Sequence, residues 1–177
     1  MEKDNSLAIL FTIISGIDKL CLSVGDAQAQ ELISSYIQLL TKIIQNHQGV
    51  VIRGKDSEFA SLFPTADTAA KASICMQNDV ANSSKTGDSA LNIRIAFILG
   101  DTLNDTINLS EQLAGQADNN QIITTAETLD QMSSNLSSAC KELTKIKGLR
   151  EANTIRVFEM TWENDEEPAL MGEMDDE

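Results

Sequence analysis

The most constraining feature of the sequence is the apolar run from Leu7 to Gly16, LAILFTIISG. The run is rich in Ile, Leu and Phe, carries no charge and ends in a glycine. Such a run, bounded by a turn residue, predicts a central strand that is covered on both faces. Ligand chemistry often lies at the carboxyl ends of such strands. Here that end offers the segment from Thr12 to Gly16 and no carboxylate.

The negative charge of the chain is concentrated near its end. The 177 residues include 27 acids and 13 bases, for a formal net charge of −14. Residues 163–177 hold eight of these acids and no base, so residues 1–162 carry only −6. We expect one domain over 1–162 and a disordered acidic tail over 163–177. Neither part favours nucleic-acid binding, because phosphate backbones attract clustered Lys and Arg.

The cysteines and the single histidine do not form a metal-binding pattern. Cys21, Cys75 and Cys140 lie far apart in the chain, and His47 is the only histidine. We therefore expect no metal and no cofactor, and we predict buried free thiols in a reducing compartment. The apolar run is too short for a membrane span, and no signal peptide is recognisable, so a cytoplasmic location is predicted.

Hydrophobic periodicity along the chain predicts helices packed on a mixed sheet, an α+β or α/β sandwich. The predicted helices are 26–48, 65–84, a short one that ends near residue 115, and a brief one after residue 125. The predicted strands after the first are 50–53, 58–63, 91–100, about 119–125, and a closing hairpin of 140–149 with 154–162.

The helix ends are predicted from capping residues. Asp26 is the expected N-cap of the first long helix, and Gly49 is its expected C-terminal stop. His47 lies in the last turn, where a capping or solvated role is expected. Gly115 is predicted to cap the short helix, and Thr125 to begin the brief one.

Taken in order, these landmarks resemble the catalytic domain of class III adenylate and guanylate cyclases. The resemblance runs from Leu7 to Trp162 and rests on FTIISG, GDAQAQELISSYIQLLTKIIQNHQGVVI, ASLFPTADTAAKASICMQ, NIRIAFILGD, DTINLSEQLAGQAD, IITTAETL and KIKG. It implies a ferredoxin-like sandwich of a mixed sheet with packed helices. It also implies pairing with a second cyclase domain, with active sites between the two chains.

The same resemblance implies a site for two divalent metals bridged by two aspartates. Ile13 and Ser57 stand at those two positions, and Gln112 stands where the family has a transition-state arginine. An alkyl side chain offers no oxygen to a hard cation, and Gln112 carries no charge. Asp56 would reach the second position only through a one-residue slip, which would turn its neighbours to the other face. We therefore predict that the chain is not an enzyme.

Three further positions that the resemblance points to are polar. Arg53 takes the place of a base-reading lysine, Asp101 that of a base-reading polar residue, and Asn108 that of a ribose-orienting asparagine. They predict a vestigial nucleotide pocket; the alternative is that Asn108 caps a helix and Arg53 is a solvated strand residue. The family's hairpin arm between the fourth and fifth strands is mostly missing, because Gly100 is followed almost directly by the next helix. The usual family dimer is therefore in question.

These observations favour a catalytically inactive cyclase-like domain that works as a regulatory or protein-interaction module in signalling of the bacterial type. Its partner would be a protein, with another cyclase-like domain or a second copy of the chain as the candidates. The alternatives are a nucleotide-binding sensor without catalysis and a pseudo-subunit that completes a site on an active cyclase. In the tail, the apolar segment 168–172 is surrounded by acids. It is either a docking segment for a basic groove or part of a solubilising end.

Overall fold

The computed structural model describes residues 7–55, 57–86, 91–143 and 155–162. Its elements, in chain order, are β1 (Leu7–Ser15), α1 (Ile17–Val24), α2 (Asp26–Asn46), β2 (Val50–Lys55), β3 (Glu58–Phe63), α3 (Ala66–Thr86), β4 (Asn92–Gly100), α4 (Leu103–Gln116), β5 (Ile122–Thr125), α5 (Ala126–Leu129), α6 (Ser134–Ser137), β6 (Cys140–Glu142) and β7 (Val157–Met160).

β1 is an inner strand of a mixed sheet with the order β2-β3-β1-β4-β5-β7-β6. It pairs antiparallel with β3 on one side and, along its whole length, with β4 on the other. β4 and β5 are parallel. The prediction of a buried central strand is confirmed, with Ile9 and Leu10 fully buried. The strand ends at Ser15, because Gly16 has a φ of 93° and turns the chain into α1.

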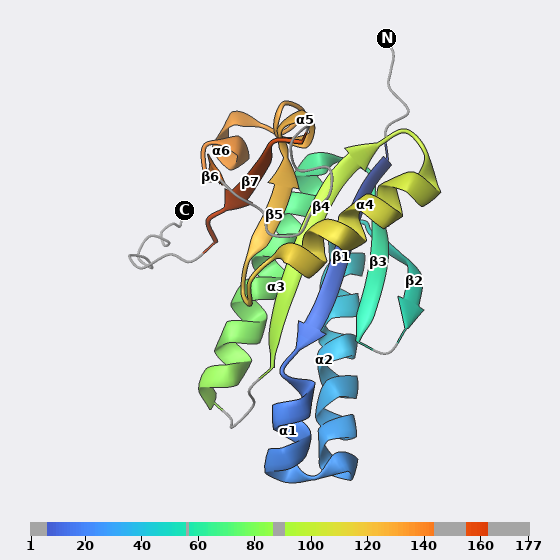
Figure 1. Cartoon of the computed structure of the whole chain (residues 1–177), viewed down its shortest axis with the longest axis vertical. Helices are drawn as coiled ribbons and strands as arrows, with labels where there is room; N and C mark the ends of the chain where they lie inside the picture. The colour runs from blue at the N-terminus through green and yellow to red at the C-terminus, as the bar shows by residue number, and fades with distance from the viewer. Residues whose placement is uncertain (1–6, 56, 87–90, 144–154, 163–177) are drawn as a thin grey trace.

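The helices cover the two faces of the sheet unequally (Figure 1). α2 and α3 lie on one side, with α1 packed against α2 beyond the end of β1, and a core cluster there joins Leu10 of β1 to Leu40 of α2. α4 crosses the opposite side over β1 and β4, where a second cluster joins Phe11 to Leu113. We call these sides the α2/α3 face and the α4 face. This arrangement confirms the predicted α+β sandwich.

The ends of α2 differ in detail from the prediction. Gly25, with φ 91°, occupies the N-cap position, and Asp26 is the first helical residue, where its charge still favours the helix N-terminus. At the other end, Gln48 rather than Gly49 takes the left-handed conformation, with φ 72°. The ring of His47 contacts the Ile43 carbonyl oxygen at 2.8 Å, which confirms its capping role.

α4 is longer than predicted and follows β4 after a short link. Only Asp101 and Thr102 separate β4 from α4, which confirms the shortened arm. The prediction that Gly115 caps this helix is wrong, since α4 continues to Gln116 and Ala117 is the C-cap. Gly115 is not among the glycines with positive φ, so it is an ordinary helical residue.

The last part of the sheet is formed by β5, β7 and β6. Thr125 caps α5 as predicted, since its side chain accepts a hydrogen bond from the Thr128 backbone N–H at 3.3 Å. β7 pairs antiparallel with both β5 and β6. The described parts of the predicted closing hairpin are therefore paired, and its predicted tip lies outside the described residues. The short helix α6 was not predicted.

Candidate functional site

The α4 face carries a row of four side chains at the carboxyl end of β1. The strand registers pair Lys55 with Glu58, Glu58 with Ile13, and Ile13 with Arg94. Directly opposed residues of antiparallel strands point to the same face, with Cβ atoms about 4.5–5.5 Å apart. Ile13 packs against the α4-face cluster, which identifies the face. We call Lys55, Glu58, Ile13 and Arg94 the β1-end row.

A β-bulge in β2 controls which side chains reach this face. The register between β2 and β3 shifts between Val51 and Arg53. A bulge places an extra residue in one strand and so changes the alternation of its side chains. Ile52 packs against the α4-face cluster, and Arg53 opposes Ala60, a member of that cluster. Ile52 and Arg53 therefore both point to the α4 face, although they are consecutive in β2.

A cavity of about 450 Å³ lies beside this row, between the β2–β3 hairpin and α4. Across it, the Arg53 guanidinium donates to the Glu111 carboxylate at 3.2 Å. Both side chains are about half exposed, so solvent screens the pair strongly. The lining residues are Phe11, Arg53, Gly54, Lys55, Glu58, Phe59 and Glu111.

Arg94 closes the row on the side of β4. Its guanidinium donates to the side-chain oxygen of Asn119 at 3.3 Å and to the Gly115 carbonyl at the end of α4 at 3.5 Å. Asn119 also accepts a hydrogen bond from the Ser15 hydroxyl at 2.6 Å. The end of β1, the start of β4 and the end of α4 are thus joined by one polar network. Within the described part of the chain, the acceptors of Arg94 are uncharged.

The structure does not gather the three residues of the predicted nucleotide pocket. Arg53 is level with Ala96 through the registers of β3 and β1. Asp101 lies five residues beyond Ala96, or about 17 Å along the strand direction. Asn108 is an exposed residue inside α4, so it does not cap that helix. Arg53 is paired with Glu111 rather than being only solvated.

Of the three positions that the resemblance assigned to catalysis, the structure brings Ile13 and Ser57 close together. Ile13 is half-buried within the β1-end row. Ser57 lies in the turn between β2 and β3, where its carbonyl accepts the Ile14 N–H at 2.9 Å. Gln112 is exposed on α4, one turn after Asn108. Asp56 lies outside the described residues.

The sequence prediction missed Glu58, Glu111 and Arg94 as members of this site. Each faces Ile13 or the cavity only because of a strand register or a helix packing angle. The alternation of Arg94 with apolar residues was visible in the sequence, but the opposing strand was not. A charge near Ile13 could not be assigned without that pairing.

The described residues of the row do not fit the pair of divalent cations that the family resemblance implies. Ile13 offers no oxygen ligand, and its neighbours include the cations Lys55 and Arg94. Of the two carboxylates in the cavity, Glu111 is paired with Arg53. The described residues contain no cluster of three or more His, Cys, Asp or Glu side chains suited to a metal.

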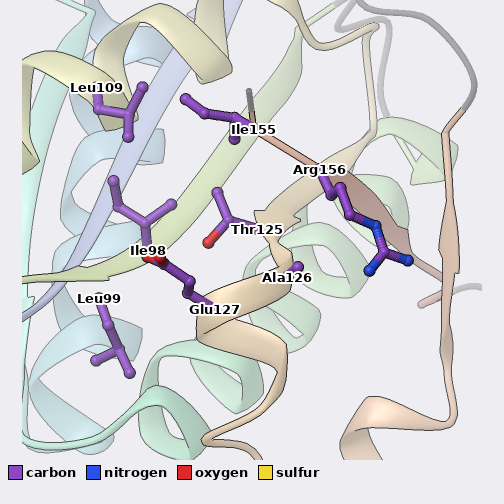
Figure 2. A pocket seen from close by; sticks show the side chains of 8 residues that line it. All are labelled: Ile98, Leu99, Leu109, Thr125, Ala126, Glu127, Ile155 and Arg156. Atoms are coloured by element: carbon purple, nitrogen blue, oxygen red, sulfur yellow. The ribbon is translucent and has the colours of Figure 1, made fainter. Parts of the chain in front are cut away.

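A second, smaller cavity of about 190 Å³ opens at the other end of the sheet (Figure 2). Its wall is largely apolar, with Ile98 from β4, Leu109 from α4 and Ile155 before β7. Arg156 lies at its edge, and its guanidinium is engaged by Glu142 at 2.8 and 2.9 Å. This hydrogen bonding lowers the pKa of Glu142. Ligand pockets are generally larger than about 300 Å³, so this cavity is small for a nucleotide.

The three thiols are free, as predicted, but each is only partly buried. Burial raises the pKa of the Cys140 thiol to about 11. Burial, reinforced by Asp79, also raises the pKa of Cys75. A raised pKa keeps a thiol protonated and therefore a poor nucleophile.

Known structures share this architecture at low sequence identity. The adenylyl cyclase CyaB from P. aeruginosa superposes with a TM-score of 0.70 at 16% identity, over 88% of this chain and 93% of that one. A dimeric guanylyl cyclase domain from Blastocladiella emersonii gives 0.72 at 13%, over 90% and 98%. An adenylate/guanylate cyclase/hydrolase from Silicibacter pomeroyi gives 0.69 at 19%, over 88% and 95%. The sequence matches no protein-family model and no curated protein.

The fold is that of a class III nucleotide cyclase domain. This confirms the resemblance drawn from the sequence motifs. It contradicts the prediction that the chain is not an enzyme, because the structures that share this cyclase fold are adenylyl and guanylyl cyclases. That prediction depended on the side chains at three aligned positions. It ignored groups such as Glu58, which only the strand register brings beside Ile13.

The cyclase-like chain has no helix, within its described ranges, that is long and apolar enough to cross a membrane. Among similar structures, one guanylyl cyclase domain is described as dimeric, and adenylate cyclases from Trypanosoma brucei are described in a monomeric state. The division at residue 162 stays a prediction, since 163–177 lie outside the described residues.

Proposed function

We propose that this cyclase-like domain is a regulatory module in signalling that works by binding a protein partner through its α4 face. The observation that carries the proposal is the β1-end row, in which a half-buried Ile13 is flanked by Glu58 and Arg94. Protein interfaces commonly have an apolar centre and a polar, charged rim. The row has that composition at the end of a strand that the rest of the sheet holds rigidly.

A second cyclase-like domain, including a second copy of this chain, is the partner that we favour. The related guanylyl cyclase domain from Blastocladiella emersonii is dimeric, which supports a domain of this fold as partner. The shortened link between β4 and α4 leaves less of the chain to reach across to a partner. The contact would therefore depend more heavily on the sheet end itself.

Replacing Ile13 with Lys tests the proposal. A third cation beside Lys55 and Arg94 should abolish pairing, whereas the matched variant Leu22→Lys should not. Leu22 is 87% exposed on α1 and is not a member of the row. Sedimentation velocity over a range of concentrations measures self-association, and mixing with an intact cyclase domain measures pairing and any change in its activity. Equal behaviour of wild type and Ile13→Lys in both experiments would exclude this face.

Nucleotide binding in the 450 Å³ cavity is a second candidate function. The cavity has the volume of ordinary ligand sites, and Arg53 and Lys55 are suited to phosphate groups. Calorimetric titration with ATP, GTP and their cyclic forms should then give binding that Arg53→Gln weakens. Incubation with Mg²⁺ or Mn²⁺ and assay of cyclic nucleotide would measure turnover by the same protein. Absence of binding at millimolar nucleotide would remove this candidate.

A further inference from the structure

The β1-end row carries two cations that have no carboxylate partner among the described residues. Arg94 donates to Asn119 and to the Gly115 carbonyl, which are uncharged. Lys55 is exposed at the end of β2. Glu111 is already paired with Arg53, so Glu58 is the acid of the row that faces these two cations. The face therefore offers positive charge directly beside Ile13 at Arg94, and again at Lys55, which lies beyond Glu58 on the other side.

Apolar surface lies between these cations. Ile13 is half-buried and provides this surface, whereas Phe11 lines the 450 Å³ cavity but is only 3% exposed. A ligand that fits this surface carries acidic groups together with one or two apolar side chains. An acidic peptide with a short apolar segment has that composition.

The chain itself supplies such a peptide after Trp162. Residues 163–167 are Glu-Asn-Asp-Glu-Glu, and Pro-Ala-Leu-Met-Gly follows at 168–172. The acids therefore come first and the apolar segment second. Moving across the sheet from β7, Arg94 of β4 is met before Ile13 of β1. Along the tail the acids precede the apolar residues, and across the sheet the cation Arg94 precedes the apolar Ile13, so the two orders match.

The tail is also long enough to extend from the end of β7 to the β1-end row. The indole N–H of Trp162 donates to the Asn120 carbonyl at 2.7 Å, next to the Asn119 that binds Arg94. This contact fixes where the chain leaves the sheet. From β7 to β1 there are three strand spacings, or about 14 Å. Five extended residues span about 16 Å, so residues 163–167 are long enough to bring 168–172 to Ile13.

We propose that residues 163–174 bind in cis across the β1-end row, with their acids at Arg94 and Lys55 and with Leu170 and Met171 against Ile13. A short tether gives an effective concentration in the millimolar range, so a weak contact suffices for occupancy. The regulatory consequence rests on the proposed function: a bound tail covers the surface that a partner would use. The contact itself does not depend on that function.

Zero-length carbodiimide cross-linking of the full chain tests the contact, because it joins carboxylates to lysine amines that touch. Mass spectrometry should find tail carboxylates joined to Lys55. Lys42 on α2 and Lys71 on α3 are exposed on the helices of the opposite face and serve as internal controls. Mixing isotope-labelled and unlabelled chains separates links within one chain from links between chains. Links to Lys55 should be within one chain.

Two tail variants and one control sharpen the result. Neutralising Glu163, Asp165, Glu166 and Glu167 together should reduce the Lys55 links formed by the remaining tail acids about tenfold, since several screened charge pairs are lost. Replacing Leu170 and Met171 with Ser should also reduce them. Neutralising Asp175 and Asp176, beyond the proposed contact, should not.

Equal labelling of Lys42, Lys71 and Lys55, links only between chains, or insensitivity to both tail variants would overturn the proposal. Partner binding is measured separately with Ile13→Lys. If a partner binds and no Lys55 link forms, tail docking fails while the proposed function stands. If the Lys55 link forms and no partner binds, tail docking stands while the proposed function fails.

Discussion

Ile13 and Ile14 are adjacent in β1 but point to opposite faces of the sheet, and these faces differ in how deeply they are buried. Ile14 is 2% exposed beneath α2 and α3, within a cluster that also contains Leu10 and Phe97. Ile13 is half-buried on the α4 face, between Glu58 and Arg94. The first face is covered by α2 and α3, and the second is only partly covered by α4. The difference indicates that the α2/α3 face supplies stability and that the end of the α4 face is available for contacts.

Replacing each isoleucine with alanine tests this comparison most strongly. Ile14→Ala should lower the free energy of unfolding by about 3 kcal/mol, because it leaves a cavity in a closed core. Ile13→Ala should cost about 1 kcal/mol, because solvent already reaches that side chain. Urea denaturation followed by circular dichroism measures both. Equal losses would show that the α4 face is packed as tightly as the other.

Two glycines provide a second contrast between the faces. A Cβ at Gly49 would lie 2.6 Å from the ring of Phe63 in β3 and 2.8 Å from Ile44 in α2, and both of these side chains are buried. Gly49→Ala should therefore destabilise the protein by about 1–3 kcal/mol. A Cβ at Gly115 would meet nothing within 4 Å, and the residue is helical. Gly115→Ala should stabilise the protein by about 0.5–1 kcal/mol, and thermal unfolding of both variants checks the opposite signs.

The glycines also show which features of the fold could be predicted from the sequence and which could not. The long helices, the central strand and the short link after Gly100 followed from periodicity and turn residues, which are local signals. Gly49 and Gly115 were both predicted as helix caps. Gly49 is instead required by the close approach of Phe63, a contact between elements that the sequence does not display. Gly115 has no such constraint.

The candidate site was less predictable than the fold for the same reason. The position of Ile13 at a strand end was clear from the sequence, but its neighbours depend on two registers and one bulge. Glu58 and Arg94 therefore appeared as ordinary strand residues. Arg53 was singled out by resemblance, whereas its partner Glu111 lies 58 residues away on α4.

The thiol of Cys140 reports on the packing around β6, which contacts the α2/α3-face cluster. Its pKa of about 11 means that few thiolates exist at pH 8.5. Alkylation by iodoacetamide should therefore be up to about 100-fold slower in the folded protein than after unfolding in urea. The folded state holds this proton more tightly. The contribution of this raised pKa to the free energy of unfolding is therefore present below pH 9 and is lost as the pH rises from about 9 to about 11. Equal alkylation rates would contradict the burial of this thiol.

The smallest effect is expected at the exposed pair of Glu142 and Arg156. The hydrogen bonds from Arg156 lower the pKa of Glu142 below 4.5. The contribution of the pair is therefore present above pH 4.5 and is lost as the pH falls through the lowered pKa. Arg156→Gln should return the pKa of Glu142 to its ordinary value, as measured by carboxyl NMR titration. Lys141→Gln, next in the chain, should leave it unchanged.

The bulge in β2 makes the charge of the α4 face depend on how the strand is paired as well as on the identity of its residues. Lys55 and Arg53 reach that face because one extra residue between Val51 and Arg53 shifts the alternation. If the same residues paired without the bulge, Ile52 would oppose Ala60 and Arg53 would oppose Phe59, and both cations would turn toward the opposite side. A one-residue shift in the pairing of β2 with β3 would thus reverse the charge of the face, with no change of side-chain chemistry anywhere in the strand.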